Sequence, residues 1–453
     1  MLPERFVERV LRDLGPDEGA ALCRVLEGES PVSVRLNGAK GMPAPSGRRI
    51  GWSPAGYYLA GRPSFTLDPD FHAGRYYVQE ASSQFVGHIV GSCGGAAGRR
   101  VLDLCAAPGG KTTLYASLVG RGGLVVANEI NRGRAAVLAD NVRKWGTGNV
   151  AVTVNDPSQV ARLQGWFDVV AVDAPCSGEG MFRKSEEARS EWSEAAVGMC
   201  AERQRSILRG AWQALRPGGL LLYSTCTFNF AENEAVLRDF AAWAADDLAA
   251  AEQVPVEKEW GVVCGSEGVF QTFRFYPHRA EGEGFFAAAA RKADSSGERV
   301  RMPKPQRNPV VWAEKRAVQE LSRWVVEPAS MRFALAGDTY YGYWQAQAEA
   351  VRMLAGVLNV ICSGVEMGQL FKGVLKPAHA LALFPELSRS AVSVAELSRE
   401  EAICYLRRGD VAVERFAEGV NLVTANGVAL GFAKRIGRRC NNMYPNSLRI
   451  LKG

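Results

Sequence analysis

Two cysteines stand where thiol chemistry could take place. Cys176 ends the segment DAPC, which begins with Asp173, and Cys226 ends the segment STC. Each segment follows an apolar run that predicts a strand, over residues 167–172 and 219–223. A cysteine is most often a small buried hydrophobic residue. Two thiols that follow strands of one sheet would instead face the same cleft, where they could act as nucleophiles.

A loop of small residues, VLDLCAAPGGKTT over residues 101–113, predicts a cofactor site. A strand ends at Leu104 and a helix opens at Lys111, so backbone amides and a helix N-terminus would face a ligand. ATP is disfavoured because Cys105 stands where a Walker A box needs glycine. A dinucleotide is disfavoured because Pro108 and the alanines break the G-x-G-x-x-G spacing. The remaining candidate, with a ribose but no phosphate, is S-adenosylmethionine.

Acidic residues follow the strands of the same predicted sheet. Glu129 ends the second strand, where a carboxylate could accept hydrogen bonds from both ribose hydroxyls. Asp156 follows the third strand, where an adenine amine would lie, and Asp173 ends the fourth. Any one such acid is more often a helix cap than a ligand contact. Their occurrence in series favours a ligand at the carboxyl edge of the sheet.

The elements that must position these residues alternate along the chain. Predicted strands cover residues 101–104, 124–128, 150–154, 167–172 and 219–223, with helical patterns over 112–118, 134–145 and 193–215. Short apolar strands between helices indicate a Rossmann-like α/β fold whose parallel sheet is covered on both faces.

Composition divides the chain into four regions. We expect an N-terminal α/β extension over residues 1–90 and an α/β core over 91–292. A linker and helical connecting region is expected over 293–390, because residues 293–310 are polar and basic and a helical pattern covers 311–360. A β-rich domain is expected over 391–453.

Several classes of protein are excluded by composition. No run of about 18 apolar residues predicts a membrane span. The start, MLPERFVERVL, has no apolar signal core, so export is not expected. The ten cysteines include no CxxC pair and the four histidines lie far from ligand-like spacing, which argues against a metal site. A disulfide framework is not expected in so large a chain, which favours a reducing cytoplasm.

Charge is unevenly distributed. The chain carries a net charge of +6, and residues 301–453 hold 21 Lys and Arg against 13 Asp and Glu, or +8, which leaves −2 for residues 1–300. The last twenty residues contain no acid, and their basic residues are Lys434, Arg435, Arg438, Arg439, Arg449 and Lys452. Such a segment suits a polyanion, most plausibly nucleic acid, or else is a solvated basic face.

The long motifs resemble the Nol/Nop/Sun family of RNA cytosine-5 methyltransferases. The matching segments, between residues 33 and 292, are YYVQEASS, DLCAAPGGKTT, DVVAVDAPCSGEGMFRK and RPGGLLLYSTCTFNFAENE. The C-terminal segments GVALGFAKR and NNMYPNSLRI are similar to the RsmF-like bacterial branch, which acts on small-subunit ribosomal RNA and carries a PUA-like RNA-binding unit. The resemblance implies a transferase that makes 5-methylcytosine in 16S ribosomal RNA, free or in the 30S subunit or an assembly intermediate, with no obligate protein partner.

The same resemblance implies roles for individual residues. Cys226 would add to C6 of cytosine, Cys176 would assist loss of the C5 proton, and Asp173 would hydrogen-bond N3. The S-adenosylmethionine contacts carry over to Cys105, Ala106, Ala107, Pro108, Gly109, Gly110, Lys111, Glu129, Asp156 and Asp173. Arg134 and Asn141, on the helix after Glu129, match a family pattern but are interpreted as structural, in helix pairing and capping. The resemblance also implies that residues 91–292 are a Rossmann-like methyltransferase core and that residues 1–90 are an RNA-binding or lid extension.

Other matched positions leave alternatives open. Lys184 would hold substrate or remain solvated, and Glu232 and Glu234 are interpreted as the start of a helix. Glu179 departs from the usual family pattern and puts only the shape of its loop in doubt.

A target base must be single-stranded or flipped out, at a cost of a few kcal/mol, before it can reach a cleft thiol. Arg274, Tyr276, His278 and Arg279 in RFYPHR are candidate RNA contacts, or else core aromatics with solvated arginines. Lys434, Arg435, Arg438 and Arg439 beside Tyr444 are the better candidate, because their charge excess is local.

Two other functions stay open from the sequence. One is a transfer RNA cytosine-5 methyltransferase, with the same chemistry on a different substrate. The other is a non-catalytic RNA-binding factor in ribosome assembly, which the paired cysteines disfavour, since a pure binder needs no cleft thiols.

Overall fold

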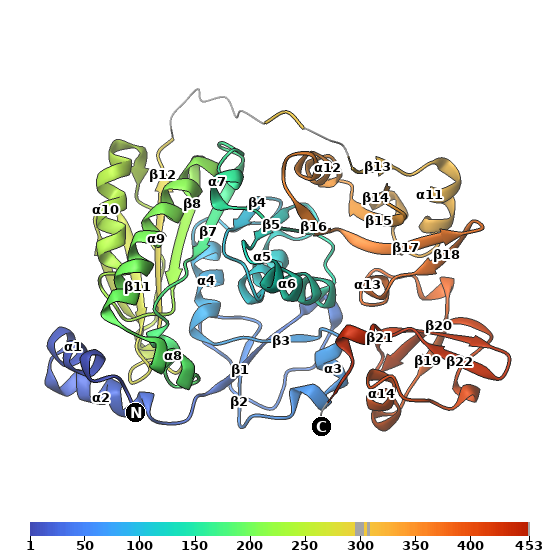
Figure 1. The fold of residues 1–453 in the computed structure, drawn as a ribbon, viewed down its shortest axis with the longest axis horizontal. Coiled ribbons are helices and arrows are strands. Elements are labelled where there is room, and N and C mark those ends of the chain that lie inside the picture. Colours follow the sequence, from blue (N-terminus) through green and yellow to red (C-terminus); the bar gives the residue numbers. More distant parts are fainter. Residues whose placement is uncertain (295–302, 306–308, 452–453) are drawn as a thin grey trace.

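The fold was analysed in a computed structural model, which describes residues 1–294, 303–305 and 309–451. The described residues build four β-sheets, and the largest forms the core (Figure 1). Its main path runs β10-β11-β12-β8-β7-β4-β5-β6-β16, with the short β9 (Leu248–Ala249) paired to β12. No helix in the described ranges is long and apolar enough to cross a membrane.

Five parallel strands form the centre of this sheet, as the apolar runs predict. They are β4 (Arg100–Asp103), β5 (Leu124–Asn128), β6 (Val150–Thr153), β7 (Phe167–Asp173) and β8 (Leu215–Thr225). Three antiparallel strands extend it beyond β8, namely β12 (Phe285–Lys292), β11 (Phe270–Phe275) and β10 (Val263–Glu267). Because the central strands are parallel, their carboxyl ends meet at one edge.

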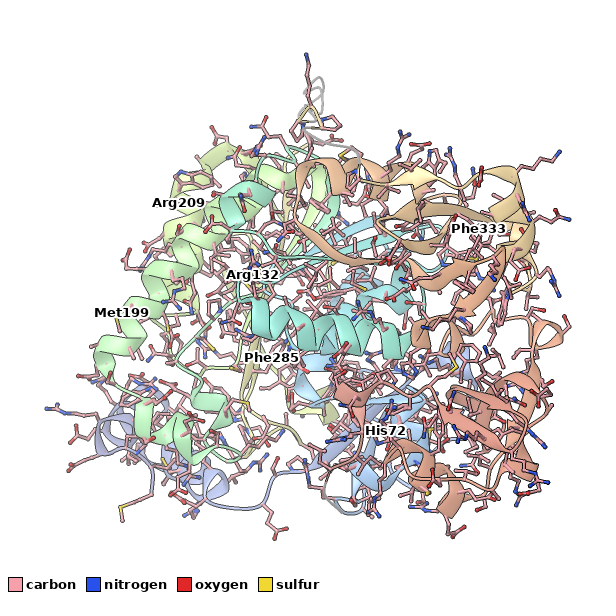
Figure 2. The ribbon with its side chains drawn as sticks, turned by 45° about the vertical axis from the view of Figure 1, so that its right-hand side comes forward. His72, Arg132, Met199, Arg209, Phe285 and Phe333 are labelled. Carbon is pink, nitrogen blue, oxygen red and sulfur yellow. The ribbon has the colours of Figure 1, made fainter. Side chains whose placement is uncertain are left out.

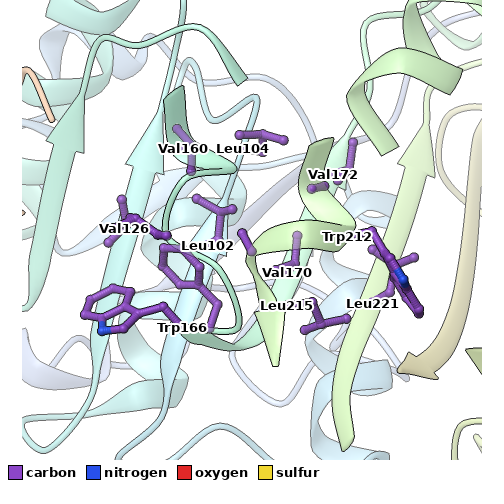
Figure 3. Close-up of a cluster of buried hydrophobic side chains, with 14 of the residues drawn as sticks. Leu102, Leu104, Val126, Val160, Trp166, Val170, Val172, Trp212, Leu215 and Leu221 are labelled. Atoms are coloured by element: carbon purple, nitrogen blue, oxygen red, sulfur yellow. The ribbon is translucent and has the colours of Figure 1, made fainter. Parts of the chain in front are cut away.

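Alternate side chains of the sheet enter two separate cores. Leu102, Val126, Val170 and Leu221 pack with helices on one face, and a close-up of this cluster is given in Figure 3. That face is covered by α7 (Pro157–Val160), α9 (Glu194–Ala214) and α10 (Glu234–Ala244). The opposite face packs against α4 (Phe85–Ser92), α5 (Gly110–Val119) and α6 (Arg132–Trp145). A sheet buried on both faces explains why its strands are almost wholly apolar.

The N-terminal region has the expected α/β character. Its helices are α1 (Glu4–Leu14), α2 (Pro16–Leu26) and the short α3 (Pro69–His72), and its antiparallel sheet has β1 (Val32–Leu36) between β2 (Gly56–Leu59) and β3 (Tyr76–Val78). Helices α1 and α2 pack on Phe182 and Phe228 of the core. This region therefore shares a hydrophobic core with the segments around the two cysteines.

The prediction of a helical connecting region is wrong. Among the described residues of this region, α11 (Lys315–Ser322), α12 (Ala348–Val357) and the short α13 (His379–Ala382) are α-helical, and the region also contains a five-stranded sheet. Its strands are β13 (Val311–Trp312), β14 (Met331–Ala336), β15 (Thr339–Trp344), β17 (Val365–Phe371) and β18 (Val374–Pro377). Gly337 and Asp338 join β14 to β15, a turn signal between aromatic and apolar runs that the helical interpretation overlooked.

One strand of this region belongs to the core sheet instead. The segment β16 (Val360–Ser363) pairs antiparallel with β6, so the connecting region is joined to the sheet by backbone hydrogen bonds. Much of the predicted linker at 293–310 lies outside the described residues.

The C-terminal region has the expected β-rich domain. Four strands pair in the order β19 (Ser393–Glu396), β20 (Gly419–Ala425), β21 (Val428–Ile436) and β22 (Arg439–Asn442). Two helices accompany them, α13 (His379–Ala382) and α14 (Arg399–Leu406). Tyr444 is buried and its hydroxyl lies 3.4 Å from His72 Nδ1, so this domain touches the N-terminal region near the His72 labelled in Figure 2.

Candidate active site

The two predicted cleft cysteines lie side by side. Their sulfur atoms are 3.2 Å apart, and both side chains are half-buried free thiols. Cys176 follows β7 and Cys226 follows β8, so the parallel strands bring together residues fifty positions apart. The hydrogen bond to Cys226, together with burial, raises the pKa of Cys176 well above its ordinary value. The raised pKa favours the protonated form of Cys176, and either thiol of the pair can donate the hydrogen bond.

Asp173 connects the thiols to the predicted cofactor loop. Its Oδ2 is 2.8 Å from Lys111 Nζ, and its Oδ1 accepts a 2.7 Å hydrogen bond from Ser224 Oγ. The ammonium of Lys111 also lies 5.0 Å from the ring centre of Phe285, a residue labelled in Figure 2. Burial lowers the pKa of Lys111, but the charge and hydrogen bond of Asp173 raise it by more. The net pKa is above its ordinary value, so this lysine stays charged. A fixed ion pair thus stands between the two parts of the site.

The segment from Cys105 to Lys111 lines a cavity of about 380 Å³. It turns sharply at Gly109, where φ is +111° and a Cβ would come within 3.0 Å of Leu138. Helix α5 then begins at Gly110, beside the cavity. The loop that the sequence assigned to a cofactor is therefore shaped by glycine and opens onto a cavity large enough for a small ligand.

Side chains from α6 and β1 hold the carbonyl groups of this loop. Arg134 donates to the Ala107 carbonyl at 3.1 Å, and Asn141 donates to the Pro108 carbonyl at 2.9 Å. Arg35 of β1 is fully buried and donates to the Gly110 carbonyl at 3.1 Å. Helix pairing and capping were the structural roles expected for Arg134 and Asn141, whereas these bonds go to the cofactor loop. The contribution of Arg35 was not predicted, because nothing near it in sequence points to the loop.

Asp103 is a residue of this cavity that sequence reasoning missed. It ends β4, is 1% exposed, and accepts one hydrogen bond from Thr112 Oγ1 through Oδ2. Its Oδ1 is buried and has no hydrogen-bond partner within the described chain. Burial raises the pKa of Asp103 to about 7. A buried acceptor without a donor at the wall of a cavity suits a cationic ligand group. Its place at a strand end was the signal available in the sequence.

The other two predicted acids lie at the expected strand ends but outside the lining of this cavity. Glu129 is 3% exposed, accepts from the Asn131 amide at 3.0 Å, and lies 3.5 Å from Arg134. Asp156 is the exposed N-cap of α7, and its Oδ1 accepts from the amide and hydroxyl of Ser158. The capping interpretation is therefore correct for Asp156. Its Oδ2 has no hydrogen bond to the part of the chain that the structure describes.

Two buried carboxylates lie beneath the thiols. Glu179, which departs from the usual family pattern, accepts hydrogen bonds from Trp192, Asn229 and the Phe228 amide, and its Oε1 is 2.7 Å from the Arg9 guanidinium. Glu232 lies before α10, and its carboxylate bonds the loops of both cysteines instead of acting as a helix-start acid. Glu234 does begin α10, and it pairs with Arg274.

Lys184 lies at the entrance of the cofactor cavity. It lines both this cavity and an adjoining one of about 770 Å³, and its Nζ is 3.5 Å from the buried Glu283. Arg62 lines the same two cavities. The two cavities therefore share a basic rim, and Lys184 is held by a carboxylate there.

The structure contradicts part of the predicted RNA surface. Arg274 and Tyr276 are buried, while His278 and Arg279 both bond Glu18 of α2, at 2.6 and 2.9 Å. The RFYPHR segment thus secures the N-terminal helices, because its basic and aromatic groups find partners within the chain.

The C-terminal basic patch is retained only in part. Tyr444 is a core residue that packs edge-on against Tyr405, and Arg435 donates to the carbonyls of Val413 and Phe416. The side chains that remain exposed there are Lys434, Arg438, Arg439 and Arg449, while Lys452 lies outside the described residues. No cluster of residues suited to a metal ion occurs among those that the structure describes.

Three segments of the chain match known families. Residues 96–291 match the family described as 16S rRNA methyltransferase RsmB/F. Residues 2–81 match the N-terminal domain of 16S rRNA methyltransferase RsmF, and residues 392–450 match the methyltransferase RsmF PUA domain.

Individual proteins agree with these matches. The ribosomal RNA small subunit methyltransferase F of Erwinia tasmaniensis is 32% identical over 420 residues, covering 88% of this chain and 84% of that protein. The protein of that name from Escherichia coli O7:K1 is 34% identical over 396 residues, covering 83% and 78%. The crystal structure of a methyltransferase homolog from Pyrococcus horikoshii is 27% identical, with a TM-score of 0.52 over 63% of this chain and 93% of that one.

The sheet order and the loop at its carboxyl edge define an α/β methyltransferase of the S-adenosylmethionine-dependent class. The descriptions of all three matched segments name RsmF or RsmB/F, and the relatives named above cover most of the chain. The chain belongs to the RsmF family of 16S ribosomal RNA methyltransferases and carries the PUA RNA-binding domain of that family.

Proposed function

We propose that this protein methylates C5 of a cytosine in 16S ribosomal RNA through a covalent bond between Cys226 and C6 of the base. The observation that carries the proposal is the thiol pair, 3.2 Å apart and next to the ion pair of Asp173 and Lys111. Family membership supports the RNA substrate. The free cysteines fit action in a reducing cytoplasm.

C5 of cytosine is a weak nucleophile, and addition of a thiolate to C6 makes it enamine-like. Cys226 supplies this sulfur nucleophile, and Cys176, whose raised pKa favours its protonated form, lies within hydrogen-bond distance of it. As Cys226 adds, N3 takes up the proton released from the Cys226 thiol, and the Asp173 carboxylate accepts a hydrogen bond from the N3–H so formed. Cys176 then assists removal of the C5 proton and departure of Cys226.

The residues of the cavity fit S-adenosylmethionine, which supplies the methyl group. The unpartnered Oδ1 of Asp103 would accept from its ammonium group, and the loop from Cys105 to Lys111 would hold its methionyl part. Glu129 and Asp156 would contact ribose and adenine, for which Asp156 still has Oδ2 available.

A direct test is methyl transfer from labelled S-adenosylmethionine to unmodified small-subunit RNA, 30S particles and transfer RNA. We expect label at cytosine C5 of ribosomal RNA with the intact protein and none with Cys226→Ala. A covalent RNA adduct should accumulate with Cys176→Ala. Labelling of transfer RNA alone would overturn the substrate. S-adenosylmethionine binding without labelling of any RNA would favour a non-catalytic assembly factor.

A further inference from the structure

The residues on either side of Cys176 are held by buried side chains. The Ser177 amide donates to Glu232 Oε1 at 2.8 Å, and the Ser177 hydroxyl donates to Glu232 Oε2 at 2.5 Å. On the other side, Gln204 Nε2 donates to the Pro175 carbonyl at 3.0 Å and to Glu232 Oε1 at 3.2 Å. The backbone before and after Cys176 is therefore fixed by one carboxylate and one amide.

The residues on either side of Cys226 are held by Asn233, which is fully buried. Its Oδ1 accepts a 2.6 Å hydrogen bond from Thr225 Oγ1, and its Nδ2 donates to the Thr227 carbonyl at 3.1 Å. Glu232 Oε2 reaches the same loop, since Thr227 Oγ1 lies 3.4 Å from it. The two adjacent residues thus contact both cysteine loops.

Asn233 stands at the N-cap of α10, and this placement makes its contacts informative. An asparagine at an N-cap ordinarily accepts a hydrogen bond from the second or third backbone amide of the helix. Here the side chain makes no such bond, and both its polar atoms bind the flanks of Cys226. Capping therefore does not explain this side chain.

Glu232 is likewise fully buried, and burial of a carboxylate is costly unless several donors compensate it. Its main chain is anchored as well, because Tyr223 of β8 donates to the Glu232 carbonyl at 2.6 Å. Strand β8 also carries Cys226 at its end. The backbone of Glu232 is thus anchored to the strand that precedes Cys226, while its carboxylate holds the loop of Cys176.

We propose that Glu232 and Asn233 are the positioning residues of the thiol pair, which set the distance between Cys176 and Cys226. The proposal rests on the proposed function in assigning chemistry to both thiols, and it adds the groups that keep them aligned. A misplacement of about 1 Å can cost about 10²-fold in rate. Neither side chain touches the substrate in this role.

The experiment uses the full-length protein with Glu232→Gln and Asn233→Asp. Each variant keeps its size. Glu232→Gln removes the charge and replaces one acceptor oxygen by a donor NH2, so the Ser177 hydroxyl must turn to accept, and Asn233→Asp cannot donate to the Thr227 carbonyl. Glu234→Gln is the matched control. It makes the same change two residues away, where the carboxylate bonds Arg274 and neither flank of a cysteine.

Two readouts are needed. Methylation of 16S RNA should show kcat lower by about 10²-fold in both variants, with KM for RNA and S-adenosylmethionine within about twofold of wild type. The second readout is closure of a Cys176–Cys226 disulfide by diamide. The two thiols lose two protons and two electrons, and diamide takes them up to become the hydrazine. Closure is expected to slow by on the order of tenfold in both variants.

Glu234→Gln should match wild type in both readouts. The proposal is overturned if Glu232→Gln and Asn233→Asp close the disulfide at the wild-type rate, or if Glu234→Gln slows closure equally. Disulfide closure needs no RNA, so a failure of the proposed function would show instead as wild-type protein that closes rapidly but methylates nothing. Should Glu232→Gln fail to fold, Ser177→Ala removes the hydroxyl bonds to Glu232 and to Thr227 Oγ1, both of which join the two cysteine loops, and should slow closure in the same direction.

Discussion

Around the two cysteines, buried carboxylates are supplied with donors from within the chain. Glu179 and Glu232 each accept several hydrogen bonds, and Glu179 also faces Arg9. Around the cofactor loop the opposite holds, because the buried Oδ1 of Asp103 has no donor within the described chain and lies beside a cavity of about 380 Å³. The thiol side is arranged before any ligand arrives, whereas the cofactor side is completed by its ligand.

The largest effect should come from removing a donor on the thiol side. Arg9→Ala leaves the buried Glu179 without its cation, which should lower the free energy of unfolding by about 3–5 kcal/mol. Denaturant unfolding measures this loss. Arg12→Ala on the same helix, with an exposed side chain, should change stability by at most about 0.5 kcal/mol. Equal effects of the two variants would contradict a prearranged thiol side.

The next effect concerns Asp173, where the two sides meet. Asp173→Asn weakens the contact with Lys111 while keeping an acceptor for Ser224, and single-turnover methyl transfer should slow by about 10²–10³-fold. Ser224→Ala, which removes only the hydroxyl donor, is the comparison variant and should be slowed far less. If Asp173→Asn transferred methyl groups at the wild-type rate, the ion pair of Asp173 and Lys111 would not contribute to methyl transfer.

A smaller effect, seen as a change with pH, tests the cofactor side. Because the pKa of Asp103 is about 7, protonation below that pH should weaken S-adenosylmethionine binding by up to about tenfold per pH unit. Titration of binding between pH 6 and 8 measures this slope. Asp103→Asn should bind more weakly at pH 8 and with a flatter dependence on pH. If the pH dependence of binding were the same in Asp103→Asn as in the wild type, that dependence would come from a group other than Asp103.

The same carboxyl group predicts a dependence of stability on pH. Its pKa is raised in the folded protein from 3.8 to about 7, so the folded state binds the proton more tightly. The contribution of Asp103 to stability is therefore fully present below about pH 4 and is lost as pH rises through about 7. In Asp103→Asn, unfolding curves should lack this component.

The smallest effect is expected far from either side of the site. Three exposed basic residues lie on or beside β21 and β22, namely Lys434, Arg438 and Arg439. Replacing all three by Gln should weaken RNA binding. The slope of the logarithm of the binding constant against the logarithm of the salt concentration should become shallower by about 0.9 per lost phosphate contact. Binding measured over a salt series checks this. Cofactor affinity should stay the same, and a change there would show that the C-terminal domain is not separate from the site.

The sequence predicted the parts of the site that depend on local pattern. Apolar runs located the five parallel strands, and their carboxyl ends correctly placed the loop from Cys105 to Lys111 and the two thiols together. This was possible because parallel strands of a doubly covered sheet have both an unmistakable composition and a fixed geometry.

The remainder depended on partners distant in sequence. Whether His278 meets RNA or a carboxylate cannot be deduced from its neighbours, since Glu18 lies 260 residues away. Glu232 matched the pattern of a helix-start acid, and only the packed structure shows it between two loops. Tyr444 likewise has the composition of a nucleic-acid contact but fills a core.

The pairing of β16 with β6 has a consequence for which pieces of this protein could exist alone. An unpaired edge strand offers free N–H and C=O groups to any passing chain and so promotes aggregation. A fragment that stops at Lys292, although it would contain the matched catalytic segment, would leave β6 as such an edge. The segment around residues 360–363 therefore covers the edge of the core sheet. A chain that ends before this segment should aggregate even where its catalytic residues are still correctly folded.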